Sequence, residues 1–186
     1  LIAGAGPAGL SAARGLGLEL VRQYAADDWT VFACVRAPAR ATELAALADS
    51  AGGRVEVHAL DLDEHGSVDS LAATLAGRAI DVLLNSAGTM GQGSFATEGL
   101  GFGRFGTSDF DDWGQVFRVN VMGPMKMAEA FVGHVAASDQ KKIVALTSVI
   151  GSITRNTAGS LYAYRASKAA LNAVMRSMSI DLRKTH

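Results

Sequence analysis

The chain has 186 residues, with 17 basic and 18 acidic side chains, and 49% of its residues are hydrophobic. This length is enough for one domain with a sizeable core. The balanced charge favours neither a nucleic-acid partner nor a membrane surface, and no apolar run is long enough to cross a bilayer. A single cysteine, Cys34, excludes an internal disulfide and is typical of a reducing compartment. We therefore expect one soluble, cytoplasmic domain that spans residues 1–186.

Short apolar runs alternate with helical patterns along the chain. The expected strands are residues 1–3, 30–35, 54–60, 81–85 and 142–147. The expected helices are residues 16–26, 41–51, 68–75, 111–137 and 163–183. Strands that alternate with helices favour a parallel sheet covered on both faces. Right-handed crossovers then predict an α/β fold of the Rossmann type, with a doubly wound sheet.

Residues 88–106 form a glycine-rich stretch that follows the fourth expected strand. It is too long for an ordinary connection, and ligands of such sheets bind beyond the carboxyl ends of the strands. One interpretation is a loop that covers the substrate, with Phe95, Phe102 or Phe105 as an apolar wall. The other is a surface loop or an oligomer contact.

The chain opens with two glycine patterns, GAGPAG at residues 4–9 and RGLG at residues 14–17. Glycines between a strand and a helix favour phosphate binding, because the backbone can approach the ligand and the helix N-terminus supplies free N–H groups. The first pattern resembles the FAD-binding fingerprint of flavoproteins. The second resembles the latter half of the TGxxxGxG loop of short-chain dehydrogenases/reductases. The first half of that loop corresponds either to Ala3-Gly4-Ala5, with an insertion before Arg14, or to residues 10–13.

Further motifs resemble the short-chain dehydrogenase/reductase family and occur in its order. They are Asp61-Leu62 after the third strand, Asn85-Ser86-Ala87-Gly88 where the family carries NNAG, Asn120, Ser148 at the end of the fifth strand, and Tyr164 and Lys168 in YxxxK. The stretch YAYRASKAALN and the long spacer before Tyr164 resemble the C-factor branch, which includes the sniffer-like carbonyl reductases. The resemblance begins at Arg14. Members of the family continue beyond the expected helix over residues 163–183, so the resemblance implies that the C-terminal part of the domain is missing from this chain.

The YxxxK pair suggests acid–base chemistry. Tyr164 and Lys168 are four residues apart, so both project from one helix face. An ammonium beside a phenol lowers the phenol pKa from its usual value near 10, so the tyrosine can exchange a proton with a carbonyl or an alcohol. The resemblance implies that Lys168 also holds the nicotinamide ribose, that Ser148 binds the substrate oxygen, and that Asn120 anchors a proton-relaying water.

Each of these assignments has a rival. Tyr162 lies two residues before Tyr164 but lacks a lysine four residues later, and Ser152 competes with Ser148. Asn120 is also compatible with a purely structural role in its helix.

The second strand ends in Arg36 rather than in the acidic residue that selects NAD, and Arg14 lies in the phosphate loop. Both cations favour the 2′-phosphate of NADP(H) over NAD(H). The expected cofactor-binding residues are Gly4, Arg14, Gly15, Leu16, Arg36, Asp61, Leu62, Asn85, Ser86, Ala87, Gly88, Tyr164 and Lys168. The four histidines lack the spacing of metal ligands, so we expect no metal site.

These observations predict an NADPH-dependent oxidoreductase that reduces a carbonyl compound or catalyses the reverse reaction. The alternatives are a nucleotide-binding signalling protein, an FAD-binding protein, and an inactive fragment. We expect a small-molecule substrate of unknown identity. The resemblance also implies a homodimer or homotetramer that pairs through the helices containing Asn120 and Tyr164.

Overall fold

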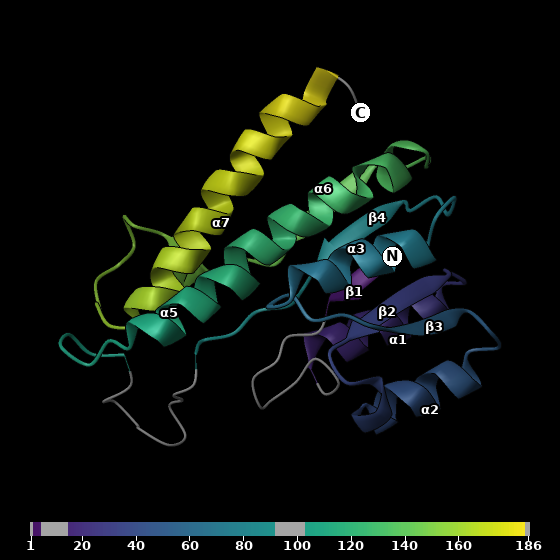
Figure 1. Ribbon diagram of the computed structural model, residues 1–186, viewed down its shortest axis with the longest axis horizontal. Coiled ribbons are helices and arrows are strands. Elements are labelled where there is room, and N and C mark those ends of the chain that lie inside the picture. The colour runs from purple at the N-terminus through teal and green to yellow at the C-terminus, as the bar shows by residue number, and fades with distance from the viewer. Residues whose placement is uncertain (1, 5–14, 92–102, 185–186) are drawn as a thin grey trace.

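The structure is a computed structural model and describes residues 2–4, 15–91 and 103–184. It contains a five-stranded parallel sheet in the order β3-β2-β1-β4-β5 (Figure 1). The strands are β1 (Ile2–Gly4), β2 (Val31–Val35), β3 (Val55–Ala59), β4 (Val82–Asn85) and β5 (Lys142–Ala145). This arrangement confirms the Rossmann-type fold expected from the sequence.

The principal helices fall between and after the strands. They are α1 (Leu16–Ala26), α2 (Thr42–Ser50), α3 (His65–Thr74), α5 (Phe110–Phe117), α6 (Gly123–Ala136) and α7 (Tyr162–Asp181). Most boundaries lie within one or two residues of the expected ones, although α3 begins three residues before the expected start. Among the described residues, no helix is long and apolar enough to span a membrane.

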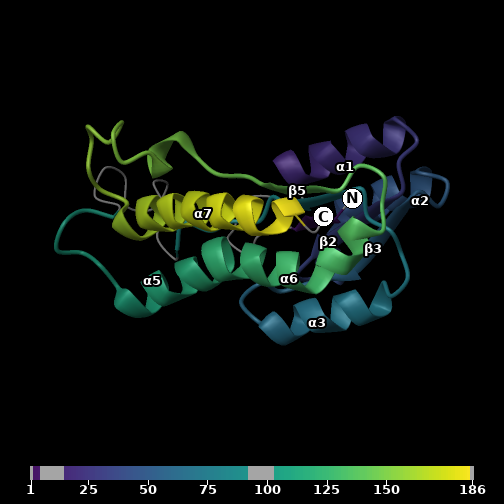
Figure 2. The same ribbon diagram turned by 90° about the horizontal axis from the view of Figure 1, so that it is seen from above.

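Each face of the sheet supports its own hydrophobic core. Along β2, Val31, Ala33 and Val35 pack with α1 and α2, whereas Phe32 and Cys34 pack with α3 and α6. Alternate side chains of a strand point to opposite faces, so an unbroken apolar run is what a strand buried on both sides requires. Figure 2 shows α1 and α3 on opposite sides of the sheet.

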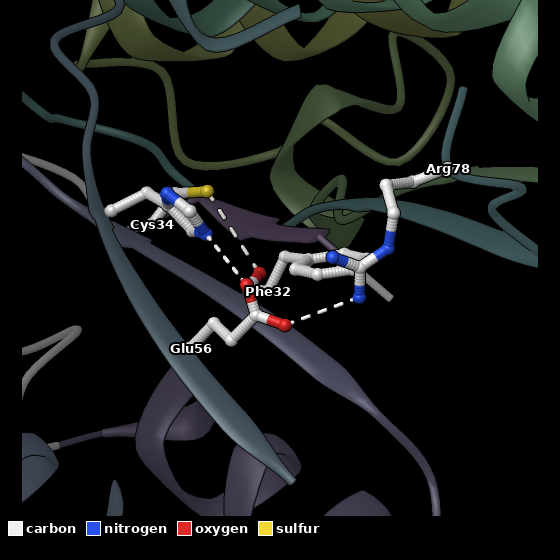
Figure 3. A network of polar contacts seen from close by, with 5 residues as sticks. Phe32, Cys34, Glu56 and Arg78 are labelled. Carbon is white, nitrogen blue, oxygen red and sulfur yellow. Dashed lines mark hydrogen bonds and ion pairs between the residues drawn. The ribbon is translucent and has the colours of Figure 1, made fainter. Parts of the chain in front are cut away.

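The single cysteine has a structural position. Cys34 is 1% exposed, and its thiol donates to the carbonyl of Phe32 at 3.8 Å (Figure 3). Burial raises the pKa of Cys34 to about 12, so the thiol stays protonated. Nearby, the guanidinium of Arg78 lies 4.6 Å from the centre of the Phe32 ring and donates to Glu56 on β3 at 3.1 Å. Cys34 is thus a core residue. Arg78 links β3 to β2 through its contacts with Glu56 and Phe32.

The expected helix over residues 111–137 is confirmed as an unbroken run of helical backbone over residues 110–136. Within it, a π-helical turn (Arg118–Met122) lies between α5 and α6. Pro124 lies in the first turn of α6 and has no N–H for an internal helical bond. The wider π-helical turn accommodates that interruption, and it contains Asn120.

Several sequence expectations concern residues outside the described ranges. They are Arg14, the fingerprint residues 5–9, and the candidate wall residues Phe95 and Phe102. Phe105 is described and is 90% exposed, and its ring lies edge-on to Tyr162.

Phe131 tests the core between the sheet and α6, because its side chain is fully buried. We expect Phe131→Ala to lower the free energy of unfolding by about 3–5 kcal/mol, as the substitution leaves a cavity. Ile153→Ala is the control, since Ile153 is 85% exposed. Urea denaturation measures both variants, and equal losses would contradict this assignment of the core.

Candidate active site

The candidate residues gather at one edge of the sheet because parallel strands share the direction of their carboxyl ends. The residues at or just after the strand ends are Gly4 in β1, Arg36 after β2, Asp61 after β3, Asn85 in β4 and Ser148 after β5. The strand order reverses between β1 and β4, and ligands bind at such a reversal in open α/β sheets.

Helix α7 carries the tyrosine and the lysine. Lys168 is 3% exposed, and its ammonium donates to the carbonyl of Leu146 at 2.9 Å. The Lys168 Nζ atom lies 5.8 Å from the centre of the Tyr164 ring, so the spacing of four residues brings the two groups together as expected. Tyr164 is partly buried, whereas the rival Tyr162 is exposed.

The pKa of Tyr164 differs from the sequence expectation. Burial raises the pKa of Tyr164 above its usual value, and a hydrogen bond with Ser148 partly opposes that rise. Burial also lowers the pKa of Lys168, because removing a charged group from water favours its neutral form. The expectation that the Lys168 ammonium lowers the tyrosine pKa is therefore wrong for this structure. Burial is the largest cause of the pKa shift of both residues.

Ser148 is positioned by a short turn. It precedes the 3₁₀ turn Val149–Gly151, and its hydroxyl oxygen accepts a hydrogen bond from the Ile150 N–H at 3.3 Å. The same side chain therefore caps the turn and contacts Tyr164.

Asn120 is fully buried in the π-helical turn. Its carboxamide accepts from the Thr89 N–H at 2.8 Å and donates to the Thr89 carbonyl at 2.8 Å. The same nitrogen donates to the Ser167 hydroxyl at 3.0 Å, and that hydroxyl donates to the Tyr164 carbonyl at 2.8 Å. The side chain thus joins the segment after β4 to α7.

Two glycines allow backbone segments to approach Lys168. A Cβ atom on Gly88 would lie 3.4 Å from both the Lys168 ammonium and the Asn120 amide oxygen. A Cβ atom on Gly151 would lie 2.8 Å from the Lys168 Cβ, which is too close for two carbon atoms. Gly88 was an expected cofactor residue, whereas sequence reasoning missed Gly151.

The remaining expected cofactor residues surround this edge. Gly15 precedes α1 as its N-cap, and Leu16 begins that helix and is 70% exposed. Arg36 is exposed directly after β2. Leu62 is buried and would contact a Cβ atom on Gly123 at 3.0 Å. Asn85, Ser86 and Ala87 continue from β4, with Asn85 and Ala87 buried.

An ionic contact joins the segment after β3 to the helix that carries Asn120. Asp63 accepts from Arg118 at 2.7 Å and from Gln115 at 2.9 Å. The hydrogen bond from Arg118 is the largest cause that lowers the pKa of Asp63. Sequence reasoning missed Asp63, Ser167 and Thr89, since no motif marks them. Within the described ranges, no three potential metal-ligating side chains come together.

Comparisons with known proteins identify the relatives of this chain. A family model described as short chain dehydrogenase matches residues 10–186. C-signal of Myxococcus xanthus is 38% identical over 104 residues, which are 56% of this chain and 57% of that protein. The chain spans about three fifths of the length of the curated relatives that it matches.

Two solved structures show the same fold. The carbonyl reductase Sniffer of D. melanogaster has a TM-score of 0.80 at 27% identity, and the match covers 98% of this chain and 75% of Sniffer. A carbonyl reductase of Pseudomonas aeruginosa in complex with NADP has a TM-score of 0.79 at 26% identity, covering 97% of this chain and 75% of that chain. Both the family and the branch that the sequence resembles are confirmed.

The buried lysine has a measurable effect on stability. Because its pKa is lowered in the folded state, the unfolded state binds more protons between that lowered value and about 10.4. The contribution of Lys168 to the free energy of unfolding therefore rises with pH in that window, with a slope of up to about 1.4 kcal/mol per pH unit. Above a pH of about 10, the raised pKa of Tyr164 has the opposite effect, because the folded state then binds more protons and the free energy of unfolding falls as the pH rises.

We expect Lys168→Met to remove this rise, and Lys142→Met, at an exposed position, to keep it. Urea denaturation of the wild type and both variants at several pH values from about 8 to 10 gives the pH dependence of the free energy of unfolding. Parallel stability curves for the wild type and Lys168→Met would contradict the lowered pKa.

Proposed function

This chain belongs to the short-chain dehydrogenase/reductase family, and on that premise we propose that it reduces a small carbonyl compound to an alcohol with NADPH. The observation that carries the proposal is the convergence of Ser148, Tyr164 and Lys168 at the carboxyl edge of the sheet. In this proposal Tyr164 exchanges the proton, Ser148 binds the substrate oxygen, and Lys168 holds the cofactor ribose.

The local geometry fits a nicotinamide cofactor. The strand order reverses between β1 and β4, and α1 begins after Gly15, an N-cap residue that has no side chain to bond the first N–H groups of the helix. Gly88 leaves open the space beside the Lys168 ammonium that a side chain would fill. When bound, the nicotinamide supplies the hydride.

The protein's own groups would handle the proton and the oxygen. The Ser148 hydroxyl and the Tyr164 phenol contact one another, so both can bind one substrate oxygen. Tyr164 donates its proton as negative charge develops on that oxygen. Lys168 holds its place through the Leu146 carbonyl, and Asn120 fixes the backbone of Thr89 beside it.

The pKa of Tyr164 favours the reductive direction near neutral pH. Because burial raises that pKa, the phenol is protonated and ready to act as an acid. Oxidation of an alcohol requires the phenolate, so the reverse reaction is favoured only at more alkaline pH.

NADP(H) is our proposed cofactor, in preference to NAD(H). Arg36 lies directly after β2 and is exposed, at the position where a side chain meets the ribose 2′ group in this type of fold. The structural relative from Pseudomonas aeruginosa, a carbonyl reductase, is in complex with NADP, which supports the same assignment.

The similarity to C-signal favours a second candidate function, a nucleotide-binding protein with a signalling role. Turnover of a carbonyl compound separates the two candidates. The flavin interpretation rests on the GAGPAG pattern, of which residues 5–9 lie outside the described ranges. The family match begins at residue 10 and so includes only the second glycine pattern.

We also propose that the protein is cytoplasmic and forms a homodimer or homotetramer through its long helices. Apolar side chains on and beside α6 and α7 support this pairing, since Met122 and Ile180 are each 49% exposed. A groove between the two helices is lined mainly by apolar residues, including Met125 and Val174.

Tyr164→Phe tests the proposed acid. We expect its rate of NADPH-dependent carbonyl reduction to fall by about 100-fold to 10,000-fold, since the proton donor is lost, while NADPH binding persists. Tyr162→Phe is the matched control on the same helix and retains the wild-type rate. The loss of NADPH absorbance with a panel of aldehydes and ketones measures both. Full activity in Tyr164→Phe would rule out the assignment.

Arg36→Asp tests the cofactor preference. We expect the variant to bind NADPH about 10-fold to 100-fold more weakly, because a charge-assisted contact to phosphate is replaced by repulsion. Its affinity for NADH should be kept or improved. Arg40→Asp changes the charge of a nearby exposed arginine and serves as the control. Fluorescence titration gives both affinities, and an unchanged NADPH affinity in Arg36→Asp would contradict the preference.

A further inference from the structure

The backbone before α7 contains an uncommon left-handed run. Gly159, Ser160 and Leu161 have φ values of 63°, 57° and 53°. Glycine adopts this region readily, but residues with a side chain do so only when their surroundings hold them there. Contacts from elsewhere must therefore stabilise Ser160 and Leu161.

Arg165 supplies these contacts from the first turns of α7. Its Nε atom donates to the carbonyls of Gly159 at 2.9 Å and Ser160 at 3.0 Å. Its Nη1 atom donates to the carbonyl of Ile150 at 3.2 Å. One guanidinium thus binds both ends of the segment that connects Ser148 to α7.

The Ile150 end of this segment carries the candidate substrate-binding serine. The Ser148 hydroxyl accepts from the Ile150 N–H, and the Ser148 carbonyl accepts from the Gly151 N–H at 3.0 Å. Gly151 packs directly on Lys168. A shift of the Ile150 carbonyl would therefore move Ser148 relative to α7.

The left-handed run at residues 159–161 also contacts the last part of the glycine-rich stretch, residues 88–106. The Leu161 N–H donates to the Gly103 carbonyl at 2.8 Å. Gly103 has a φ of 65°, and a Cβ atom there would lie 3.0 Å from the Leu161 Cα. Arg165 consequently stabilises a junction of the two segments that border the candidate site.

We propose that Arg165 is a positioning residue for carbonyl reduction, which holds the Ser148 turn at a fixed place beside Tyr164. This inference rests on the proposed function. Arg165 acts through Ser148, since its guanidinium is bonded to Gly159, Ser160 and Ile150. Arginine suits this role better than lysine, because a planar guanidinium presents donors that reach separate carbonyls at once, whereas a lysine ammonium is a compact charge at one place.

Arg165→Met and Arg165→Lys test the proposal in the full chain, with Arg176→Met as the control. Arg176 is exposed on the same helix. We expect Arg165→Met to lower kcat by about 10-fold to 100-fold, as misplacement of a reacting group by about 1 Å has effects of that size. Its dissociation constant for NADPH should be unchanged, Arg165→Lys should be intermediate, and Arg176→Met should match the wild type.

The pH profile separates positioning from a general loss of structure. The hydrogen bond with Ser148 lowers the pKa of Tyr164. Loss of this hydrogen bond in Arg165→Met should raise the pKa of Tyr164 further, so the alkaline limit of carbonyl reduction should move to higher pH. A partly unfolded enzyme would lose active molecules without moving that limit. Thermal unfolding and circular dichroism verify folding, and Arg165→Lys replaces Arg165→Met if the latter does not fold.

Hydrogen exchange tests the contact without any need for turnover. We expect the Leu161 and Gly151 amides to exchange faster in Arg165→Met than in Arg176→Met. Equal exchange, or an unchanged kcat and pH profile in an active enzyme, would overturn the positioning role. A wild type that reduces no carbonyl compound would instead overturn the proposed function, and the catalytic role of Arg165 with it, whatever the exchange rates show.

Discussion

The buried carboxamide of Asn120 is the constraint on which the site depends. It binds both backbone groups of Thr89 and the hydroxyl of Ser167, and a buried amide left without these partners would be costly. The contact fixes the segment after β4 against α7, and Ser167 extends it to the backbone of Tyr164. The π-helical turn that presents Asn120 is therefore part of the site's construction.

A hydrogen bond to a backbone carbonyl and close packing place Lys168. Its ammonium meets the Leu146 carbonyl, while Gly88 and Gly151 bring the backbone up to it from two sides. Burial lowers the pKa of Lys168 and raises that of Tyr164. Both shifts favour the uncharged form, and a protonated Tyr164 is what the proposed role of this residue requires.

The strands and the convergence of the motifs could be predicted from the sequence, because apolar runs and strand-end residues are local signals. The helix over residues 111–137 was also predicted, and Pro124 could have indicated the local change in its hydrogen bonding, but the wide turn at Asn120 depends on tertiary contacts. The sign of the Tyr164 pKa shift was missed, since burial cannot be derived from a spacing of four residues. Arg165 and Gly151 were missed for a similar reason, as their partners lie on segments folded back from elsewhere in the chain.

The most direct test of the proposed carbonyl reduction is to follow a label from the cofactor to the product. The wild type would be incubated with NADPH carrying deuterium at the nicotinamide C4 position, on either face, together with a panel of carbonyl compounds. We expect deuterium from one face to appear on the carbinol carbon of the product alcohol. Saturable NADPH binding with no deuterium in any product would contradict it and favour the signalling function.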